Sequence, residues 1–269
     1  MRAVEAAGFD SVWTVEHVLV PADYESPYPY SRSGKMPGGE TSAIPDPLIW
    51  LSYVAAVTER LLLGTGILIL PQRNAAIVAK EAASLDRLSG GRLRLGIGVG
   101  WLEEEFDALG ASFAGRGKRT DAYVAAMRAL WTGQEITLDD GYQQWHKAIS
   151  LPTPTNGTVP IVIGGHSDAA ARRAGRIGDG FFPGKGSPEQ LAQLFTVMRQ
   201  AAEDAGRDPA LIEVTAGTRD IGGPDPIGAV EAMAAIGVHR VIIPPLAWDP
   251  AAASDAYGAF GENIIAKSA

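Results

Sequence analysis

The chain has 269 residues, 46% of them hydrophobic, and a formal net charge of −8 without a single cysteine. This apolar content suffices for a core in one large domain or two small ones, and we expect one domain over residues 1–269. Because the charge balance is acidic, we expect no binding of nucleic acid. The absence of cysteine excludes disulfides and thiol chemistry. No apolar run reaches the roughly 18 residues of a membrane span, and the first residues lack the apolar core of a signal peptide. We therefore expect a cytoplasmic protein.

Apolar runs typical of buried strands alternate with helical segments along the chain. The expected strands are residues 10–15, 61–70, 93–100, 159–164, 180–183, 211–217 and 240–244. The expected helices are residues 47–59, 74–88, 120–131, 168–177, 188–205 and 227–236. This alternation predicts a parallel α/β fold, and seven strands favour a (β/α)8 TIM barrel over a doubly wound sheet. The opening VEAAGFDSVW is typical of a helix end entering a strand, so we expect the barrel to lack its first strand.

Two stretches interrupt this rhythm. Residues 18–47 are rich in Pro, Gly, Ser and Tyr, exceed the length of ordinary βα loops, and are expected to form a lid or substrate loop, with disorder as the alternative. Possible contacts from this loop are Tyr24, Tyr28, Tyr30, Arg32 and Lys35. Residues 132–158 are expected to form an insertion with a hairpin around residues 139–141.

Glycines mark the points where neighbouring strands leave the sheet. They are Gly64, Gly66, Gly96, Gly98 and Gly100. The missing side chains predict room for a large flat group, which is a first indication of a ring cofactor. The run over residues 96–100 is no dinucleotide-binding motif, because it lacks the third glycine and Trp101 stands where a phosphate would need space.

The expected active site lies at the carboxyl ends of the strands, where barrel enzymes carry it. His17 follows the first visible strand and is the best candidate for a general acid or base. The adjacent Glu16 is expected to orient His17, to line the site, or to serve in a structural pair. The carboxylates at 103–105 look like a metal or acid cluster, but they open a helix, where carboxylates are favoured anyway, and the second interpretation is preferred. No histidine pair has metal-ligand spacing, so we expect no metal site, and a metal-dependent hydrolase is a weakened alternative.

A second candidate site joins the strand at 159–164 to the following helix. Gly164, Gly165, His166 and Ser167 would supply free backbone N–H groups, a hydroxyl and the positive end of a helix to a phosphate. The alternative is a tight turn in which Ser167 or Asp168 only caps the helix.

Three separated blocks resemble the luciferase-like monooxygenase superfamily, specifically its branch of coenzyme F420-dependent oxidoreductases. The blocks are AGFDSVWTVEH, GTGILILPQRNAAIVAKEAASLDRLSGGRLRLGIGVGWLEEEF and IVIGGHSDAAARRAGRIGDGFFP. The similarity covers most of residues 4–245, and the blocks stand in the family's order.

The resemblance implies a flavin or deazaflavin bound by a luciferase-like barrel, with its phosphate near residues 164–167. It implies a non-prolyl cis peptide between Gly66 and Ile67 that supports the back of the ring, with Thr65 in the same run. It also implies that His17 lies beside the ring and handles protons during hydride transfer. Gly100 and Trp101 would line the ring.

Two departures from the family pattern bear on the cofactor. The sugar dehydrogenases that use deazaflavin have a glutamate where this chain has Trp101, which puts their proton-donor scheme in doubt here. Many FMN-using relatives have Arg-Tyr where this chain has Arg116-Gly117, which favours F420 over FMN.

The leading hypothesis is therefore an F420-dependent oxidoreductase that acts on a small organic molecule and forms a homodimer. The alternatives are an FMN-dependent monooxygenase supplied by a separate reductase, and a protein that binds the cofactor without turnover.

Overall fold

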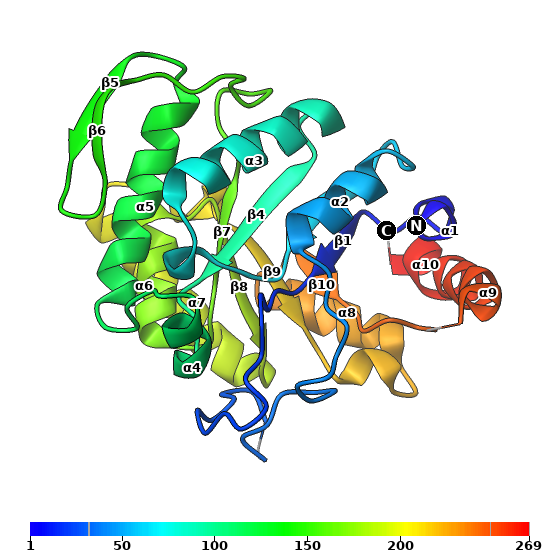
Figure 1. Cartoon of the computed structure of the whole chain (residues 1–269). Helices are drawn as coiled ribbons and strands as arrows, with labels where there is room; N and C mark the ends of the chain where they lie inside the picture. The colour runs from blue at the N-terminus through cyan, green and yellow to red at the C-terminus, as the bar shows by residue number, and fades with distance from the viewer. Residues whose placement is uncertain (32, 248, 269) are drawn as a thin grey trace. The chain divides into compact units, whose positions relative to one another are not determined.

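The computed structural model describes residues 1–31, 33–247 and 249–268, so Arg32, one of the expected loop contacts, lies outside the described residues. The chain divides into two compact units. The first unit consists of Met1–Val12, Val54–Leu63 and Pro160–Ala269, and the second of Trp13–Tyr53 and Gly64–Val159. Both combine strands with helices, as the predicted α/β class requires (Figure 1).

Three elements run from one unit into the other, namely β1 (Ser11–Thr14), α2 (Pro47–Ala55) and β2 (Leu62–Thr65). The predicted helix end before the first strand is α1 (Arg2–Ala6), and β1 follows it. Within the first unit, the backbone N–H of Leu62 donates to Asp10 at 2.9 Å, and within the second, the N–H of Gly66 donates to Thr14 at 2.6 Å. The ends of β1 and β2 are therefore joined in each unit.

The second unit is built on β4, whose residues Leu93, Leu95 and Ile97 are fully buried. Its other elements are β3 (Leu68–Ile69), η1 (Leu70–Gln72), α3 (Ala75–Ser89), β4 (Leu93–Gly98), α4 (Glu103–Ala108), α5 (Arg116–Trp131), β5 (Ile136–Asp139) and β6 (Gln144–Ala148). Strand β3 pairs in parallel with β4. The side chain of Asn74 caps α3 by accepting from the N–H groups of Ala76 and Ile77, as predicted.

The apolar run at 61–70 forms two strands where the sequence predicts one. Strand β2 ends at Thr65, β3 begins at Leu68, and the peptide bond between Gly66 and Ile67 is cis, as the resemblance implied. The predicted hairpin is present as the antiparallel pair β5–β6, which lies beside α5 in Figure 1.

The first unit carries four parallel strands in the order β7-β8-β9-β10. Its elements besides α1 are β7 (Ile161–Gly164), α6 (Asp168–Ile177), β8 (Gly180–Lys185), α7 (Pro188–Asp204), η2 (Pro209–Leu211), β9 (Glu213–Gly217), η3 (Asp220–Gly222), α8 (Pro226–Ala235), β10 (Arg240–Ile242), α9 (Pro250–Phe260), the π-helical turn η4 (Gly261–Ile265) and α10 (Ala266–Ser268). Ser187 caps α7 in a capping box with Gln190, which explains why this helix begins where it does.

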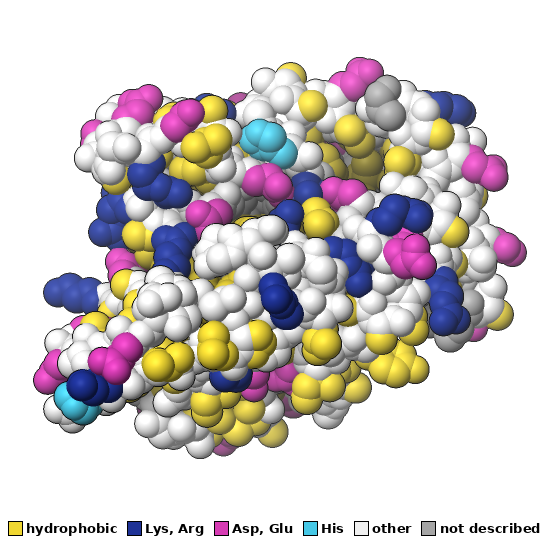
Figure 2. All heavy atoms as spheres, turned by 90° about the horizontal axis from the view of Figure 1, so that it is seen from above, with side chains coloured by type: hydrophobic (Ala, Val, Ile, Leu, Met, Phe, Trp, Pro, Cys, Tyr) yellow, Lys and Arg dark blue, Asp and Glu magenta, His cyan; other side chains and the backbone are white. Residues whose placement is uncertain are grey.

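Two further features are the distribution of charge on the surface and the length and polarity of the helices. On the face shown in Figure 2, acidic and basic side chains are interspersed with hydrophobic ones. Among the described residues, every helix is too short or too polar to cross a bilayer.

Candidate functional site

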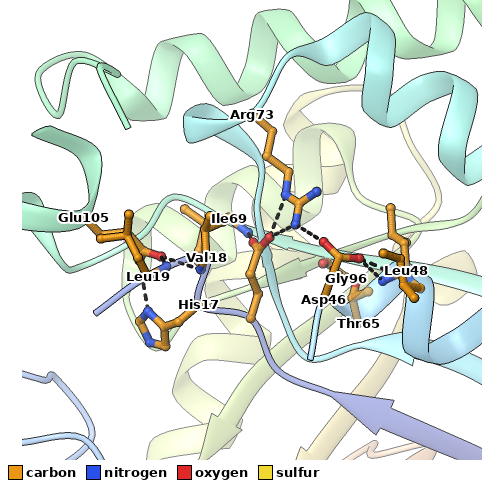
Figure 3. A network of polar contacts seen from close by, with 12 residues as sticks. His17, Val18, Leu19, Asp46, Leu48, Thr65, Ile69, Arg73, Gly96 and Glu105 are labelled. Atoms are coloured by element: carbon orange, nitrogen blue, oxygen red, sulfur yellow. Dashed lines mark hydrogen bonds and ion pairs between the residues drawn. The ribbon is translucent and has the colours of Figure 1, made fainter. Parts of the chain in front are cut away.

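His17 follows β1 in the second unit, and its ring is held by a residue far along the chain. The Nδ1 atom of His17 lies 2.9 Å from Oε2 of Glu105, and the two side chains are 12% and 2% exposed. The other carboxylate oxygen, Oε1, accepts hydrogen bonds from the backbone N–H groups of Val18 at 2.7 Å and Leu19 at 3.3 Å (Figure 3). Glu105 on α4 therefore holds both the imidazole and the first two residues of the 18–47 loop.

Trp101 lies at the centre of an aromatic cluster with His17. Its ring makes edge-to-face contacts with His17, Tyr24 and Tyr28, at centroid distances of 5.8, 5.5 and 5.2 Å. Tyr24 is buried with Met36, whose N–H donates to the Tyr24 hydroxyl at 3.1 Å. The described residues of the 18–47 loop are therefore packed rather than disordered, and Tyr24 and Tyr28 lie against Trp101. The lid or substrate role of this loop stays a prediction.

A second anchor of this loop is Glu104 on α4. Its Oε1 accepts hydrogen bonds from the N–H groups of Glu25 at 2.7 Å and Ser26 at 3.0 Å. Desolvation opposes ionisation of this carboxyl, but the side chain of Ser26 and the backbone N–H groups lower the pKa of Glu104 to about 2. Residues 103–105 lie in the first turn of α4, as the sequence predicts, and two of them, Glu104 and Glu105, also hold distant segments of the chain.

Glu16 does not contact His17 but belongs to a buried ionic network. Its two carboxylate oxygens accept from the backbone N–H of Ile69 and from the guanidinium of Arg73, whose Nε lies 2.6 Å from Oε1 (Figure 3). Arg73 also donates to Asp46 at 2.7 Å, and Asp46 caps α2 through the N–H groups of Leu48 and Ile49. The expectation that Glu16 orients His17 is wrong, because Glu105 makes that contact and Glu16 forms the structural pair.

The charges of this network shift one another's pKa values. Burial raises the pKa of Glu16 above its usual range, although Arg73 and the Ile69 N–H oppose the shift. Burial would also raise the pKa of Asp46, but hydrogen bonds from Arg73 and from backbone N–H groups lower it. Burial disfavours the charge on Arg73, yet Glu16 and Asp46 outweigh it and raise the pKa of that guanidinium.

The glycines at the strand ends accommodate the protein's own atoms. A methyl group added to Gly64 would overlap the indole of Trp13, one on Gly96 would overlap the carbonyl of Thr65, and one on Gly98 would overlap the side chain of Ile67. At Gly100, it would lie 2.6 Å from the ring of Phe106. The interpretation that these four glycines leave a slot for a flat cofactor is therefore wrong.

The remaining residues expected beside the ring have partners of their own. The Thr65 hydroxyl donates to the carbonyl of Gly96 at 2.6 Å, and the Gly100 carbonyl accepts from Nε of Arg116 at 3.2 Å. The side chain of Thr65 is therefore already bonded within the protein. A cofactor would meet the backbone of Thr65 and of the cis peptide Gly66–Ile67.

The predicted phosphate loop lies in the first unit, between β7 and α6. Ser167 caps α6 by accepting from the N–H of Ala170 at 3.2 Å. The N–H of Gly165 donates to Phe182, and His166 Nδ1 lies 3.1 Å from the carbonyl of Pro183. The part of the chain that the structure describes contains no group of three or more His, Asp or Glu that could hold a metal ion. An anion at this loop would meet the Ser167 hydroxyl proton and the N–H groups at the start of the ten-residue helix α6, although the N–H groups of Ala170 and Ala171 already donate to Ser167.

Sequence reasoning missed three residues of this site, namely Glu105, Arg73 and Asp46. Their partners lie 27 to 88 residues away in the chain, so no local spacing connects them. The one local signal is Asp46 directly before Pro47, which is typical of a helix start.

Comparisons with known proteins agree on one family. A model of the family described as luciferase-like monooxygenase matches residues 1–259. An uncharacterized protein of Mycobacterium tuberculosis is 35% identical over 206 residues, which are 77% of this chain and 71% of that protein. An F420-dependent glucose-6-phosphate dehydrogenase of Beutenbergia cavernae is 32% identical over 85% of this chain, which spans only 64% of that enzyme.

Solved structures show the same fold at low sequence identity. An F420-dependent secondary alcohol dehydrogenase, in complex with an F420-acetone adduct, matches 98% of this chain and 92% of its own with a TM-score of 0.77 and 20% identity. The oxygenating constituent of a diketocamphane monooxygenase of Pseudomonas putida, in complex with FMN, matches 80% of this chain and 59% of its own with a TM-score of 0.64 and 20% identity. These likenesses confirm the predicted luciferase-like α/β fold class.

Proposed function

Because the chain belongs to the luciferase-like monooxygenase family, we propose that it is an oxidoreductase that transfers a hydride between coenzyme F420 and a small organic molecule. The observation that carries this proposal is His17, an imidazole at a strand end whose Nδ1 is held by buried Glu105 beside Trp101. The relatives at 32–33% identity that are named as F420-dependent dehydrogenases support the choice of cofactor.

Each unit, taken by itself, contains residues that would contact such a cofactor. The N-terminus of α6, with Ser167 and the residues before it (Gly164, Gly165 and His166), would hold the phosphate through N–H groups and a hydroxyl. The cis peptide of Gly66–Ile67, with Thr65, Gly100 and Trp101, would contact the ring. Once bound, the deazaflavin supplies the hydride carrier.

In this mechanism His17 moves the proton that accompanies the hydride. The contact with Glu105 occupies Nδ1, so Nε2 is the atom that would take or give this proton. The packed tyrosines of the 18–47 loop and Trp101 would exclude water from His17. Glu16 takes no part in the reaction, because both of its oxygens are bound to Ile69 and Arg73.

Titration of the purified protein with F420 and with FMN, followed by cofactor fluorescence, tests the proposal. We expect F420 to bind at least about tenfold more tightly, and reduced F420 to reduce a carbonyl compound from a substrate panel without oxygen. Tighter binding of FMN together with oxygen consumption would establish the alternative, an FMN-dependent monooxygenase fed by a separate reductase. Binding of neither cofactor would refute both.

A His17→Ala variant separates an enzyme from a cofactor carrier. We expect it to keep F420 binding and lose turnover, whereas a carrier without turnover would show no change. The homodimer and the cytoplasmic location stay predictions, and light scattering of the purified protein tests the first.

A further inference from the structure

We propose that Glu105 is the positioning residue of His17. It holds the imidazole in the tautomer that has its proton on Nδ1 and leaves Nε2 unprotonated. This inference rests on the proposed role of His17 as acid and base, and it adds a residue to which the sequence assigned no function.

The hydrogen bonds to Glu105 determine this tautomer. An ionised carboxylate has only acceptor atoms, so the nitrogen that faces it must be a donor. That nitrogen is Nδ1 of His17, 2.9 Å from Oε2. The second oxygen, Oε1, already accepts two backbone N–H groups, from Val18 and Leu19, which suits an ionised group. A neutral His17 therefore bears its hydrogen on Nδ1, and Nε2 is left as the basic atom.

Other carboxylates near His17 are already engaged. Glu16, next in sequence, accepts from Ile69 and Arg73. Glu104, next to Glu105 on α4, accepts from Glu25 and Ser26 through its Oε1, while its buried Oε2 has no hydrogen-bond partner among the described residues. Among the residues described, Glu105 is the carboxylate that contacts His17, and its side chain is 2% exposed, so water competes little for its oxygens.

The same carboxylate also joins His17 to the loop at 18–47. The N–H groups of Val18 and Leu19, at the root of the loop, share one oxygen, and the imidazole takes the other. A change in Glu105 is thus expected to alter the ring's tautomer and to loosen the loop root together. A change in Glu104 affects the loop alone, because its partners are Glu25 and Ser26.

Nitrogen-15 NMR of histidine-labelled protein, at a pH where the ring is neutral, tests the tautomer directly. The chain has four histidines, so the His17 signals are identified by their loss in His17→Ala. We expect wild type to show a protonated Nδ1 and a bare Nε2. In Glu105→Gln, the amide oxygen should keep the two backbone N–H groups and the amide NH2 should face Nδ1, which transfers the hydrogen to Nε2. Glu104→Gln is the matched control and should leave the tautomer unchanged.

Kinetics with the holoenzyme supply the second measurement. With Nε2 blocked by a hydrogen, kcat of Glu105→Gln should fall about 10- to 1,000-fold, since a wrong tautomer costs up to about 10⁴-fold in serine-protease triads. The dissociation constant for F420 should stay within about twofold, because Glu105 is assigned no contact with the cofactor.

Several results would overturn the inference. These are a wild-type His17 with its hydrogen on Nε2, an unchanged tautomer in Glu105→Gln, or a switched tautomer with unchanged kcat. The wild-type spectrum decides even if the variant fails to fold. Absence of F420 binding with the expected wild-type tautomer would refute the proposed function and leave the assignment of the Nδ1 proton standing.

Discussion

Replacement of Arg73 by methionine should destabilise the protein far more than loss of an ordinary surface charge. Arg73 is 17% exposed, and its main partner Glu16 is only 1% exposed. Methionine fills much of the same space but leaves Glu16 without its cation. The expected result is a large loss of stability at neutral pH, because a buried carboxylate would remain uncompensated.

The attraction between the two charges sets the size of this loss. Two unit charges about 4 Å apart attract by about 4 kcal/mol at an effective dielectric constant of about 20. Breaking a buried ion pair by removing one partner costs about 3–5 kcal/mol in measured cases. The backbone N–H of Ile69 still donates to Glu16 in the variant, which keeps the cost from rising further. We therefore expect a loss of about 3–5 kcal/mol in the free energy of unfolding.

The pH dependence of the loss has a definite sign. Burial raises the pKa of Glu16 above its usual value of 4.5, so the native state binds this proton more tightly than the unfolded chain does. Stability from this group is full below pH 4.5 and declines as pH rises through the folded-state pKa. Removing Arg73 raises that pKa further. The gap between wild type and variant should be widest at neutral pH and shrink as the pH falls and Glu16 is protonated.

Urea unfolding followed by circular dichroism at pH 7 and pH 5 measures both effects. The double variant Arg73→Met with Glu16→Gln should recover part of the loss, because the uncompensated charge is gone. The exposed pair of Glu135 and Lys147 provides a control, and Lys147→Met should cost less than about 1 kcal/mol. A loss below about 1 kcal/mol for Arg73→Met at pH 7 would refute the view that Arg73 neutralises a buried carboxylate.

Three further predictions test the remaining parts of the structure. Gly64→Ala should lower the free energy of unfolding by about 1–3 kcal/mol without any cofactor present, because the added methyl group meets the indole of Trp13. Gly258→Ala in α9 has open space around the added methyl group and should raise it by about 0.5–1 kcal/mol. Urea unfolding measures both changes. Ser167→Ala and Ser187→Ala should each cost about 0.5–2 kcal/mol as helix caps, but only the first should weaken F420 binding in fluorescence titration. Lys35→Met should speed limited proteolysis of the 18–47 loop severalfold, because the ammonium lies 3.9 Å from a buried ring centroid and donates to the loop backbone.

Local chemistry made several elements predictable. The helix at 168–177 has the bounds that the sequence predicts, because a Gly-Gly-His-Ser run ends the strand and Ser167 caps the helix. The cis bond at Gly66–Ile67 came from the resemblance alone, and the apolar run around it was predicted as one strand because every residue in it suits a buried strand. Helix α9 was missed, although Asp249 caps it through the N–H of Ala251 and so left a local signal.

The site was harder to predict because its contacts cross long stretches of chain. Glu16 is adjacent to His17 in sequence, but its two oxygens are taken by Ile69 and Arg73, so adjacency did not identify the carboxylate that orients the ring. The carboxylate that does so is 88 residues away. The glycines illustrate the opposite error, since a missing side chain shows that space is needed but does not show what fills it.

The contacts that hold the two ends of the 18–47 loop would allow its middle to vary with the substrate. Glu104 and Glu105 on α4 hold the 18–47 loop at its start, and Asp46 with Arg73 holds it at its end. All of these bonds use loop backbone or loop-end residues, so they constrain the path of the chain and not the side chains in between. Residues in the middle of the loop can then change without moving His17. Exchange of residues 37–45, which leaves Tyr28, Lys35 and Met36 in place, should therefore change which molecule reacts while the His17 tautomer stays as in wild type.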